Sequence, residues 1–198
     1  MDTRVVPLAD DGLTSVRREI KVLLDEDEAR ALAATLARIA PPVESAIVAV
    51  YFDSASAQLA ARVERTPGDC VKVRVKAYAP DRSAIPGRVV LEVKRERGGL
   101  TSKDRTWLPP AEVSGVIARV LAPSFGALAP VLATSYRRRV YQASPSWRVT
   151  LDDALRFHAA DWSVFAGGAI PSRGVFWLFY GCERRVVAEL KHGPGGLP

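Results

Sequence analysis

The chain has 198 residues, 48% of them hydrophobic, with a net charge of +6 and a pI near 9.6. It is long enough for one domain with a hydrophobic core, and it contains no apolar run of the ~20 residues that cross a bilayer. The start lacks a signal-peptide pattern and the two cysteines lie far apart, so we expect a cytoplasmic protein without a disulfide framework or a zinc site. The excess of arginine and lysine predicts an anionic partner such as nucleic acid, anionic lipid, a nucleotide or polyphosphate, and a membrane-protein partner remains open.

The first predicted elements are a strand and a helix. Residues 1–14 read as a loose leader, and a strand is expected at 15–24. Asp25 and Glu28 have the spacing of a capping box, which predicts a helix starting at this point. The apolar stripe of this helix is expected at Leu32, Leu36 and Ile39, and Pro41-Pro42 should stop it.

The middle of the chain predicts mainly strands. They are expected at Ser45–Asp53, Gln58–Val63, Lys72–Tyr78, Arg88–Arg97 and Ser102–Leu108. A helix should begin at Pro110, with Val113, Ile117 and Val120 on one face, and end at Pro123. One or two further helical turns are expected within Phe125–Leu132.

The last third predicts strands at Ser135–Ala143, Trp147–Leu151, Val175–Tyr180 and Arg185–Lys191, and a disorder-prone tail from His192. Residues 160–172 favour neither helix nor strand. Many antiparallel strands with a few helices indicate an α+β protein or a β-barrel. We expect one domain over 1–198, with its core at about 15–192.

Several of these strands alternate strictly between apolar and charged residues. The segment 91–97 places Glu92, Lys94 and Glu96 on one face, because successive side chains of a strand point to opposite sides. The same pattern gives further charged faces, which carry Arg17, Glu19 and Lys21; Lys72, Arg74 and Lys76; Arg148, Thr150 and Asp152; and Glu189 and Lys191. A slip of one residue in register would bury charge.

Two arrangements explain this alternation. In one, the strands form an open sheet with a solvated polar face and a hydrophobic back. In the other, the sheet closes and the polar faces line a charged channel. Acidic and basic groups confined in a channel would bind a multiply anionic ligand, with carboxylates holding a divalent cation, and phosphate chains fit that description. The alternation itself is compatible with both arrangements.

Common catalytic motifs are absent from the sequence. It has no Walker-type loop, no dinucleotide fingerprint and no nucleophile elbow. The densest basic cluster is Tyr136-Arg137-Arg138-Arg139-Val140-Tyr141. Arginines beside aromatic rings are typical of RNA-binding surfaces, so an RNA-binding β protein is a rival hypothesis.

The ordered set of motifs resembles the VTC domain. This is the polyphosphate polymerase domain of the vacuolar transporter chaperone complex and its bacterial relatives, within the triphosphate tunnel (CYTH-like) superfamily. The resemblance covers about 16–191 and rests on the segments Arg18–Leu23, Tyr51–Ser54, Lys72–Lys76, Leu91–Gly99, Ser135–Tyr141, Arg148–Asp152 and Ala188–Lys191.

The resemblance implies a closed antiparallel β-barrel with a few flanking helices, whose bore binds tripolyphosphate, polyphosphate or ATP. It implies phosphate-binding, catalytic roles for Lys21, Arg74, Lys76, Lys94, Arg138 and Arg148, substrate-binding roles for Lys103 and Lys191, and a metal-binding role toward Mn²⁺ or Mg²⁺ for Glu189. The implied activity is metal-dependent transfer of the ATP γ-phosphate to a polyphosphate chain. Arg138 follows from the motif match, whereas alternation leaves Arg137 or Arg139 equally available.

Three features depart from the family pattern. Tunnel hydrolases begin with Glu-x-Glu-x-Lys, and Arg17 stands at the first position here, which argues against hydrolysis. The family continues into a terminal segment with another lysine, whereas this sequence stops at Pro198, and neither an SPX domain nor a membrane anchor is expected beside the domain. The sequence is therefore expected to be a fragment, a shortened product or a domain that has lost function, and a non-catalytic polyphosphate- or nucleotide-binding relative is the second hypothesis.

Overall fold

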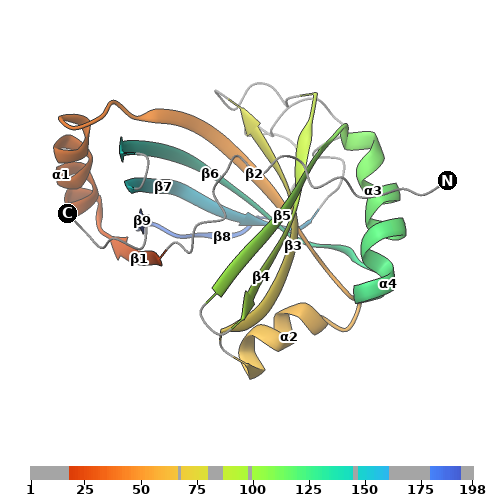
Figure 1. Ribbon diagram of the computed structural model, residues 1–198. Coiled ribbons are helices and arrows are strands. Elements are labelled where there is room, and N and C mark those ends of the chain that lie inside the picture. Colours follow the sequence, from red (N-terminus) through yellow and green to blue (C-terminus); the bar gives the residue numbers. More distant parts are fainter. Residues whose placement is uncertain are drawn as a thin grey trace.

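A computed structural model of the chain describes residues 18–66, 68–79, 87–97, 100–144, 147–160 and 179–192 (Figure 1). The strands are β1 (Arg18–Leu24), β2 (Val43–Asp53), β3 (Asp69–Ala79), β4 (Val89–Arg97), β5 (Leu100–Leu108), β6 (Ala129–Ser144), β7 (Trp147–His158), β8 (Phe179–Cys182) and β9 (Val186–His192). The helical elements are α1 (Glu26–Ala37), α2 (Gln58–Arg65), η1 (Pro110–Glu112), α3 (Val113–Val116), η2 (Ile117–Leu121) and α4 (Ala122–Phe125). None of the helices in these ranges is long and apolar enough to span a membrane.

The strands form one antiparallel sheet in the order β1-β9-β7-β6-β2-β3-β4-β5, and β8 also pairs with β7. Strands twist relative to their neighbours, and Figure 1 shows β3, β4 and β5 running steeply across the direction of β6 and β7. Within the described ranges, no backbone pairing joins the end strands β1 and β5. The expected closed barrel is therefore observed only as a curled antiparallel sheet of an α+β protein.

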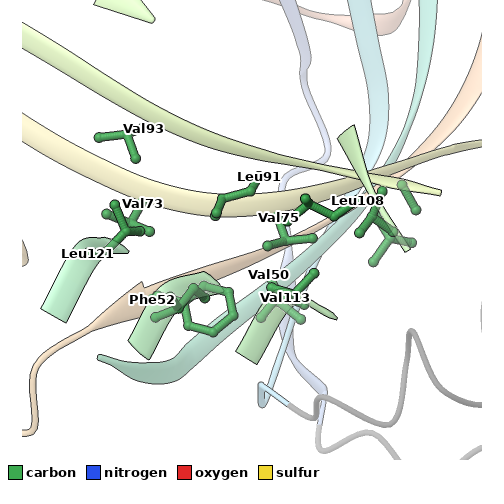
Figure 2. Packing of buried hydrophobic residues seen from close by; sticks show 14 of the residues in the cluster. Val50, Phe52, Val73, Val75, Leu91, Val93, Leu108, Val113 and Leu121 are labelled. Atoms are coloured by element: carbon green, nitrogen blue, oxygen red, sulfur yellow. The ribbon is translucent and has the colours of Figure 1, made fainter. Parts of the chain in front are cut away.

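One face of this sheet is apolar and packs against helices. The larger core cluster joins β2, β3 and β4 to the helical segment 113–125, and Val48, Val73 and Val113 are fully buried in it. Figure 2 shows Val50 and Phe52 of β2 beside Val113, with Leu121 near Val73. The valine-rich alternation of β3 and β4 produces this face, because every second side chain points toward the helices.

A second core cluster lies under α1. Ala29, Ala33 and Leu36 of this helix pack against Tyr141, Val149, Leu151, Val186 and Ala188 of β6, β7 and β9. Figure 1 shows α1 and the α3–α4 segment at opposite ends of the molecule. Both clusters lie on the same face of the sheet, so the opposite face is left for the charged residues.

The predicted capping box of α1 is confirmed. The Glu28 backbone N–H donates to Asp25 Oδ1 at 2.8 Å, and the Asp25 N–H donates to Glu28 Oε2 at 3.0 Å. The helix ends at Ala37, before the proline pair. Ile39 was expected on the apolar stripe but follows the helix end and is 59% exposed, because the turn rotates it away from the sheet.

The segment Gln58–Val63 is helix α2 instead of the expected strand. The reason is a cap supplied from the preceding strand. Asp53 Oδ1 accepts from the Leu59 N–H at 2.9 Å and Oδ2 accepts from the Ala60 N–H at 2.9 Å. These bonds satisfy donors at the helix start that have no partner within the helix, and alanine and arginine favour the helical state.

The helical segment after β5 differs from the expectation in two respects. Val113, Ile117 and Leu121 are buried while Val120 is 43% exposed, because a π-helical turn at Ile117–Leu121 carries Leu121 to the core side. Pro123 lies in the first turn of α4, and the helix ends instead at Phe125, before Gly126, whose φ is +72°.

The strands are in places longer than expected. The helical turns expected within Phe125–Leu132 are wrong beyond α4, since β6 already begins at Ala129. Strand β7 continues to His158 through a backbone irregularity at Ala154, whose φ is +52°. Of the strand expected at 175–180, residues 179 and 180 belong to β8, and 175–178 lie outside the described residues. The leader 1–14, almost all of 160–172 and the tail after His192 lie outside the described residues.

Candidate functional site

Charged residues of seven strands share one face of the sheet, here called the polar face. The register follows them from strand to strand: Lys21 opposes Glu189, Arg138 opposes Asp152, and Arg74 opposes Glu92. The charged members of this face in the described ranges are Glu19, Lys21, Lys72, Arg74, Lys76, Glu92, Lys94, Glu96, Lys103, Arg105, Arg138, Arg148, Asp152, Glu189 and Lys191. Ten of these are basic and five are acidic, so the face is net positive.

All nine site residues proposed from the sequence lie on this face: Lys21, Arg74, Lys76, Lys94, Lys103, Arg138, Arg148, Glu189 and Lys191. They come from β1, β3, β4, β5, β6, β7 and β9. Arg17 lies outside the described residues. The period of two predicted the face of each strand, and the sheet register brings the faces together.

Glu92 is the centre of the first charge cluster and is fully buried. Its Oε1 accepts from Arg74 Nε at 2.7 Å and lies 3.4 Å from Lys76 Nζ, while Oε2 accepts from Arg105 Nε at 2.9 Å. Burial would raise the pKa of Glu92, but attraction to Lys76 and Arg74 outweighs it and holds the pKa below the usual range. A buried carboxylate is tolerated in this position because three cationic side chains, Arg74, Lys76 and Arg105, surround it.

The cations around Glu92 differ in how firmly they are held. Arg74 also donates from Nη1 to the Tyr51 hydroxyl at 3.1 Å, and its guanidinium lies 5.8 Å from the centre of that ring. Lys76 has no such second contact among the described residues. Burial, followed by repulsion from Arg74, lowers the pKa of Lys76 to about 7 despite Glu92. The Lys76 amine is therefore only partly protonated near neutral pH.

A second charge cluster joins β1, β5 and β9. Glu19 Oε1 lies 3.1 Å from Lys103 Nζ and 3.4 Å from Lys191 Nζ. Glu189 Oε1 lies 3.2 Å from Lys191 Nζ and 4.0 Å from Lys21 Nζ. Because β1 and β5 are the end strands of the sheet, the Lys103–Glu19 ion pair bridges its two edges, which we call the seam.

Three members of these clusters were not among the site residues proposed from the sequence: Glu92, Glu19 and Arg105. Alternation had placed Glu92 on a charged face without giving it a role in the site. Glu19 stands two residues before Lys21, and its alternation with that lysine was the signal that could have identified it. Burial would raise the pKa of Glu19, but Lys191 and Lys103 hold it well below the usual range. Arg105 stands two residues after Lys103 on the same face, and its contact with Glu92 could not be read from the sequence.

The run Arg137-Arg138-Arg139 is divided between the two faces of the sheet. Arg138 donates from Nε and Nη2 to Asp152 at 2.6 and 2.5 Å and lies on the polar face. Arg137 and Arg139 both donate to Asp153 on the opposite face. Of the three arginines, Arg138 is the one that lies on the polar face with the other proposed site residues. The three arginines do not form one continuous basic patch, which removes the main support for the RNA-binding hypothesis.

Lys94 opposes Lys103 in the register of β4 and β5 and is 6% exposed. It forms an ion pair with Glu96, whose Oε2 also lies 3.0 Å from the Cys70 thiol. The Lys94 hydrogen bond lowers the pKa of Glu96 to about 2. Arg148 opposes Lys191 in the register of β7 and β9. Among the described residues, no three His, Cys, Asp or Glu side chains gather closely enough to form a metal site by themselves.

Comparison with solved structures shows the fold. An adenylyl cyclase homologue, HpAC1 from Hippeastrum, described as having a dominant triphosphatase activity, is 14% identical with a TM-score of 0.50, covering 87% of this chain and 78% of its own. A protein from Bacillus halodurans described as an adenylate cyclase candidate is 13% identical with a TM-score of 0.52, covering 91% and 81%. The PH1819 protein of Pyrococcus horikoshii is 11% identical with a TM-score of 0.51, covering 89% and 77%.

Comparison of the sequence shows the family. No curated protein matches the chain. The sequence profile of the VTC domain matches residues 12–126, which is more than half of the chain and includes β1 to β5. The chain therefore belongs to the VTC domain family, and its fold is of the triphosphate tunnel type.

Proposed function

We propose that the polar face binds tripolyphosphate, polyphosphate and ATP, and that the protein transfers the γ-phosphate of ATP to a polyphosphate chain. The observation that carries this proposal is the cluster around Glu92, where Arg74, Lys76 and Arg105 converge from two strands beside it. Phosphoryl transfer depends on positioning and charge neutralisation more than on a covalent catalyst. A net positive face of fixed cations meets this requirement.

We infer that the polar face is the inner wall of a tunnel. The Lys103–Glu19 ion pair supports this, because it brings the two edge strands within side-chain reach. The tunnel would close along this seam through side chains instead of backbone hydrogen bonds. A ligand lying along the seam would contact cations from both edges of the sheet.

The charge clusters indicate how the protein's own residues act. Arg74 is fixed by Glu92 and Tyr51, and Arg138 is fixed by Asp152, so both guanidinium groups are preorganised toward phosphate oxygens. Lys94, Lys103, Arg148 and Lys191 extend the cationic surface along the chain of phosphates. Together they would hold the donor and acceptor phosphates in line.

Glu19 and Glu189 fit a divalent cation such as Mg²⁺ or Mn²⁺. Both are carboxylates, the preferred ligands of these ions, and they share Lys191 as a neighbour. Mg²⁺ sites commonly use one or two carboxylates and take their other ligands from phosphate and water. When bound, the ion would neutralise charge on the phosphate oxygens. Both carboxylates contact lysines, which would have to turn toward phosphate as the ion binds.

A second candidate is a non-catalytic tunnel that only binds polyphosphate or nucleotide. It is favoured by the lysine contacts on Glu19 and Glu189, which already neutralise the two carboxylates. Both candidates take the cytoplasm as the site of action, consistent with the two free thiols of Cys70 and Cys182.

The binding experiment is calorimetric titration of tripolyphosphate, with Arg74→Ala and Arg137→Ala as a matched pair. Arg137 lies on the opposite face and is 54% exposed. Micromolar or tighter binding should be lost in Arg74→Ala, because a preorganised cation is removed, and retained in Arg137→Ala. Failure of the wild-type protein to bind tripolyphosphate, with binding of a length-matched RNA instead, would overturn the proposal.

The turnover experiment measures polyphosphate formation from ATP with Mn²⁺ or Mg²⁺. Glu189→Gln should abolish turnover, because a ligand of the cation is lost, while tripolyphosphate binding remains largely intact. Wild-type protein that binds tripolyphosphate without turnover under either metal would establish the non-catalytic alternative.

A further inference from the structure

An aromatic pair ends the polar face on the side of β3 and β5. Trp107 follows Arg105 by two residues and Tyr78 follows Lys76 by two residues, so both rings project from the polar face. Their ring centres are 6.1 Å apart, and the ring planes make an angle of 44°. None of the phosphate contacts proposed above uses either ring.

The exposure of the two rings is unequal. Trp107 is 42% exposed, whereas Tyr78 is half-buried. The indole therefore rests on Tyr78 and presents part of its surface to solvent beside a strongly charged site. An exposed indole is a flat apolar surface on which a nucleobase can stack. Stacking of this kind accepts any base, because every base has a π-face.

The pair lies next to the cations that would hold phosphate. Burial, followed by the charge of Glu92, raises the pKa of the Tyr78 hydroxyl, although Arg138, Arg105 and Arg74 act to lower it. The hydroxyl is therefore close to the cations of the first charge cluster. Along β5, Trp107 is two residues from Arg105 and four from Lys103, which corresponds to about 7 and 14 Å at the rise of an antiparallel strand. A base on Trp107 would thus direct a triphosphate along β5 toward Lys103 and Glu19.

We propose that Trp107, supported by Tyr78, is the stacking platform for the base of a nucleoside triphosphate. This inference rests on the proposed phosphate-binding function. It adds the part of the site that binds nucleotides more tightly than inorganic phosphate chains. Because the indole stacks against the flat face of any base, it contributes affinity for ATP and GTP alike. It contributes nothing to tripolyphosphate, which has no base.

The experiment compares ATP with inorganic tripolyphosphate by calorimetry in the presence of EDTA, so that turnover does not interfere. Trp107→Leu should weaken ATP binding by about 5- to 150-fold, the range expected for loss of one stacked base, and leave tripolyphosphate binding unchanged. Trp107→Phe keeps an aromatic face and should retain most of the ATP affinity. Tyr180→Leu is the matched control, because Tyr180 is a 60% exposed aromatic residue on β8.

Tryptophan fluorescence of the wild-type protein provides a readout that does not depend on the folding of a variant. ATP should quench the emission and tripolyphosphate should not, and Trp107→Phe should remove the quenching although three other tryptophans remain. Equal weakening of both ligands in Trp107→Leu, or unchanged ATP binding, would overturn the inference while leaving phosphate binding in place. Failure of the wild-type protein to bind either ligand would overturn the proposed function, and the inference with it.

Discussion

At the scale of single residues, the site depends on how buried charges are paired. Glu92 accepts hydrogen bonds from the Nε and Nη2 atoms of Arg74, whereas the Lys76 amine is a more distant neighbour, 3.4 Å from the Glu92 carboxylate. One carboxylate cannot fully compensate three cations, so the cluster retains positive charge. The least favourably placed of them is Lys76, whose pKa is lowered to about 7. The protonation state of Lys76 should therefore change when a ligand binds.

The prediction for Lys76 concerns proton uptake. Above pH 7 the amine is increasingly neutral in the free protein, and a bound phosphate chain would raise its pKa again, because an anion favours the charged form. Tripolyphosphate binding near pH 8 should therefore take up a proton, and affinity should fall as the pH rises from 7 to 9. Calorimetry in buffers of different ionisation enthalpy measures this uptake.

The control for this prediction is Lys76→Arg, which stays charged throughout the range. Its binding should lack the additional proton uptake of the wild-type protein, and the protonation of tripolyphosphate itself is common to both titrations. Identical uptake in the two proteins would show that Lys76 does not titrate in the site.

At the scale of elements, the strands follow from their own pattern, whereas one helix depends on a neighbour. Alternation in β3, β4, β7 and β9 matches the observed faces, since the pleat repeats every two residues. Helix α2 begins with Ala57 in a left-handed conformation and without a side-chain cap of its own. Asp53 at the end of β2 supplies the acceptor for its first N–H groups.

Asp53→Ala should destabilise the protein by about 1–2 kcal/mol, the cost of losing a helix cap that satisfies two backbone N–H donors. Asp53 is 4% exposed, so water replaces its oxygens poorly. Urea unfolding measures the change, and hydrogen exchange of residues 58–65 should show the loss at α2. Asp27→Ala, at an 87% exposed side chain of α1, should cost much less, and equal losses in the two variants would contradict this role of Asp53.

At the scale of the whole molecule, the two core clusters determine which face of the sheet carries the site. Helix α1 and the 113–125 segment cover the apolar face, which leaves the opposite face for charge. The curl of the sheet then brings β1 to β5, where the Lys103–Glu19 pair forms the seam. Ligand binding inside this curl should hold the two edges together.

Tripolyphosphate should therefore slow backbone hydrogen exchange in β1 and β5, the strands that form the seam. An edge strand has unpaired backbone groups and opens more easily than an interior strand, and a ligand bound to Lys21 and Lys103 would link the two edges. Exchange measured by mass spectrometry with and without ligand tests this, with residues 113–125 as the internal reference. Uniform slowing across the chain would indicate general stabilisation instead of closure at the seam.

The sequence by itself determined the faces of the strands, the cap of α1 and the charges available to the site, because these depend on local backbone periodicity and on neighbouring residues. Alternation alone places Lys21, Arg74 and Lys94 on polar faces, and the family resemblance selects Arg138. Only the tertiary structure decided that Glu92 holds Arg74, Lys76 and Arg105, that Asp53 caps α2, and that Glu19 meets Lys103 across the seam. These contacts join residues that are 6 to 84 positions apart, so they depend on strand register and sheet curvature, which no local pattern in the chain specifies.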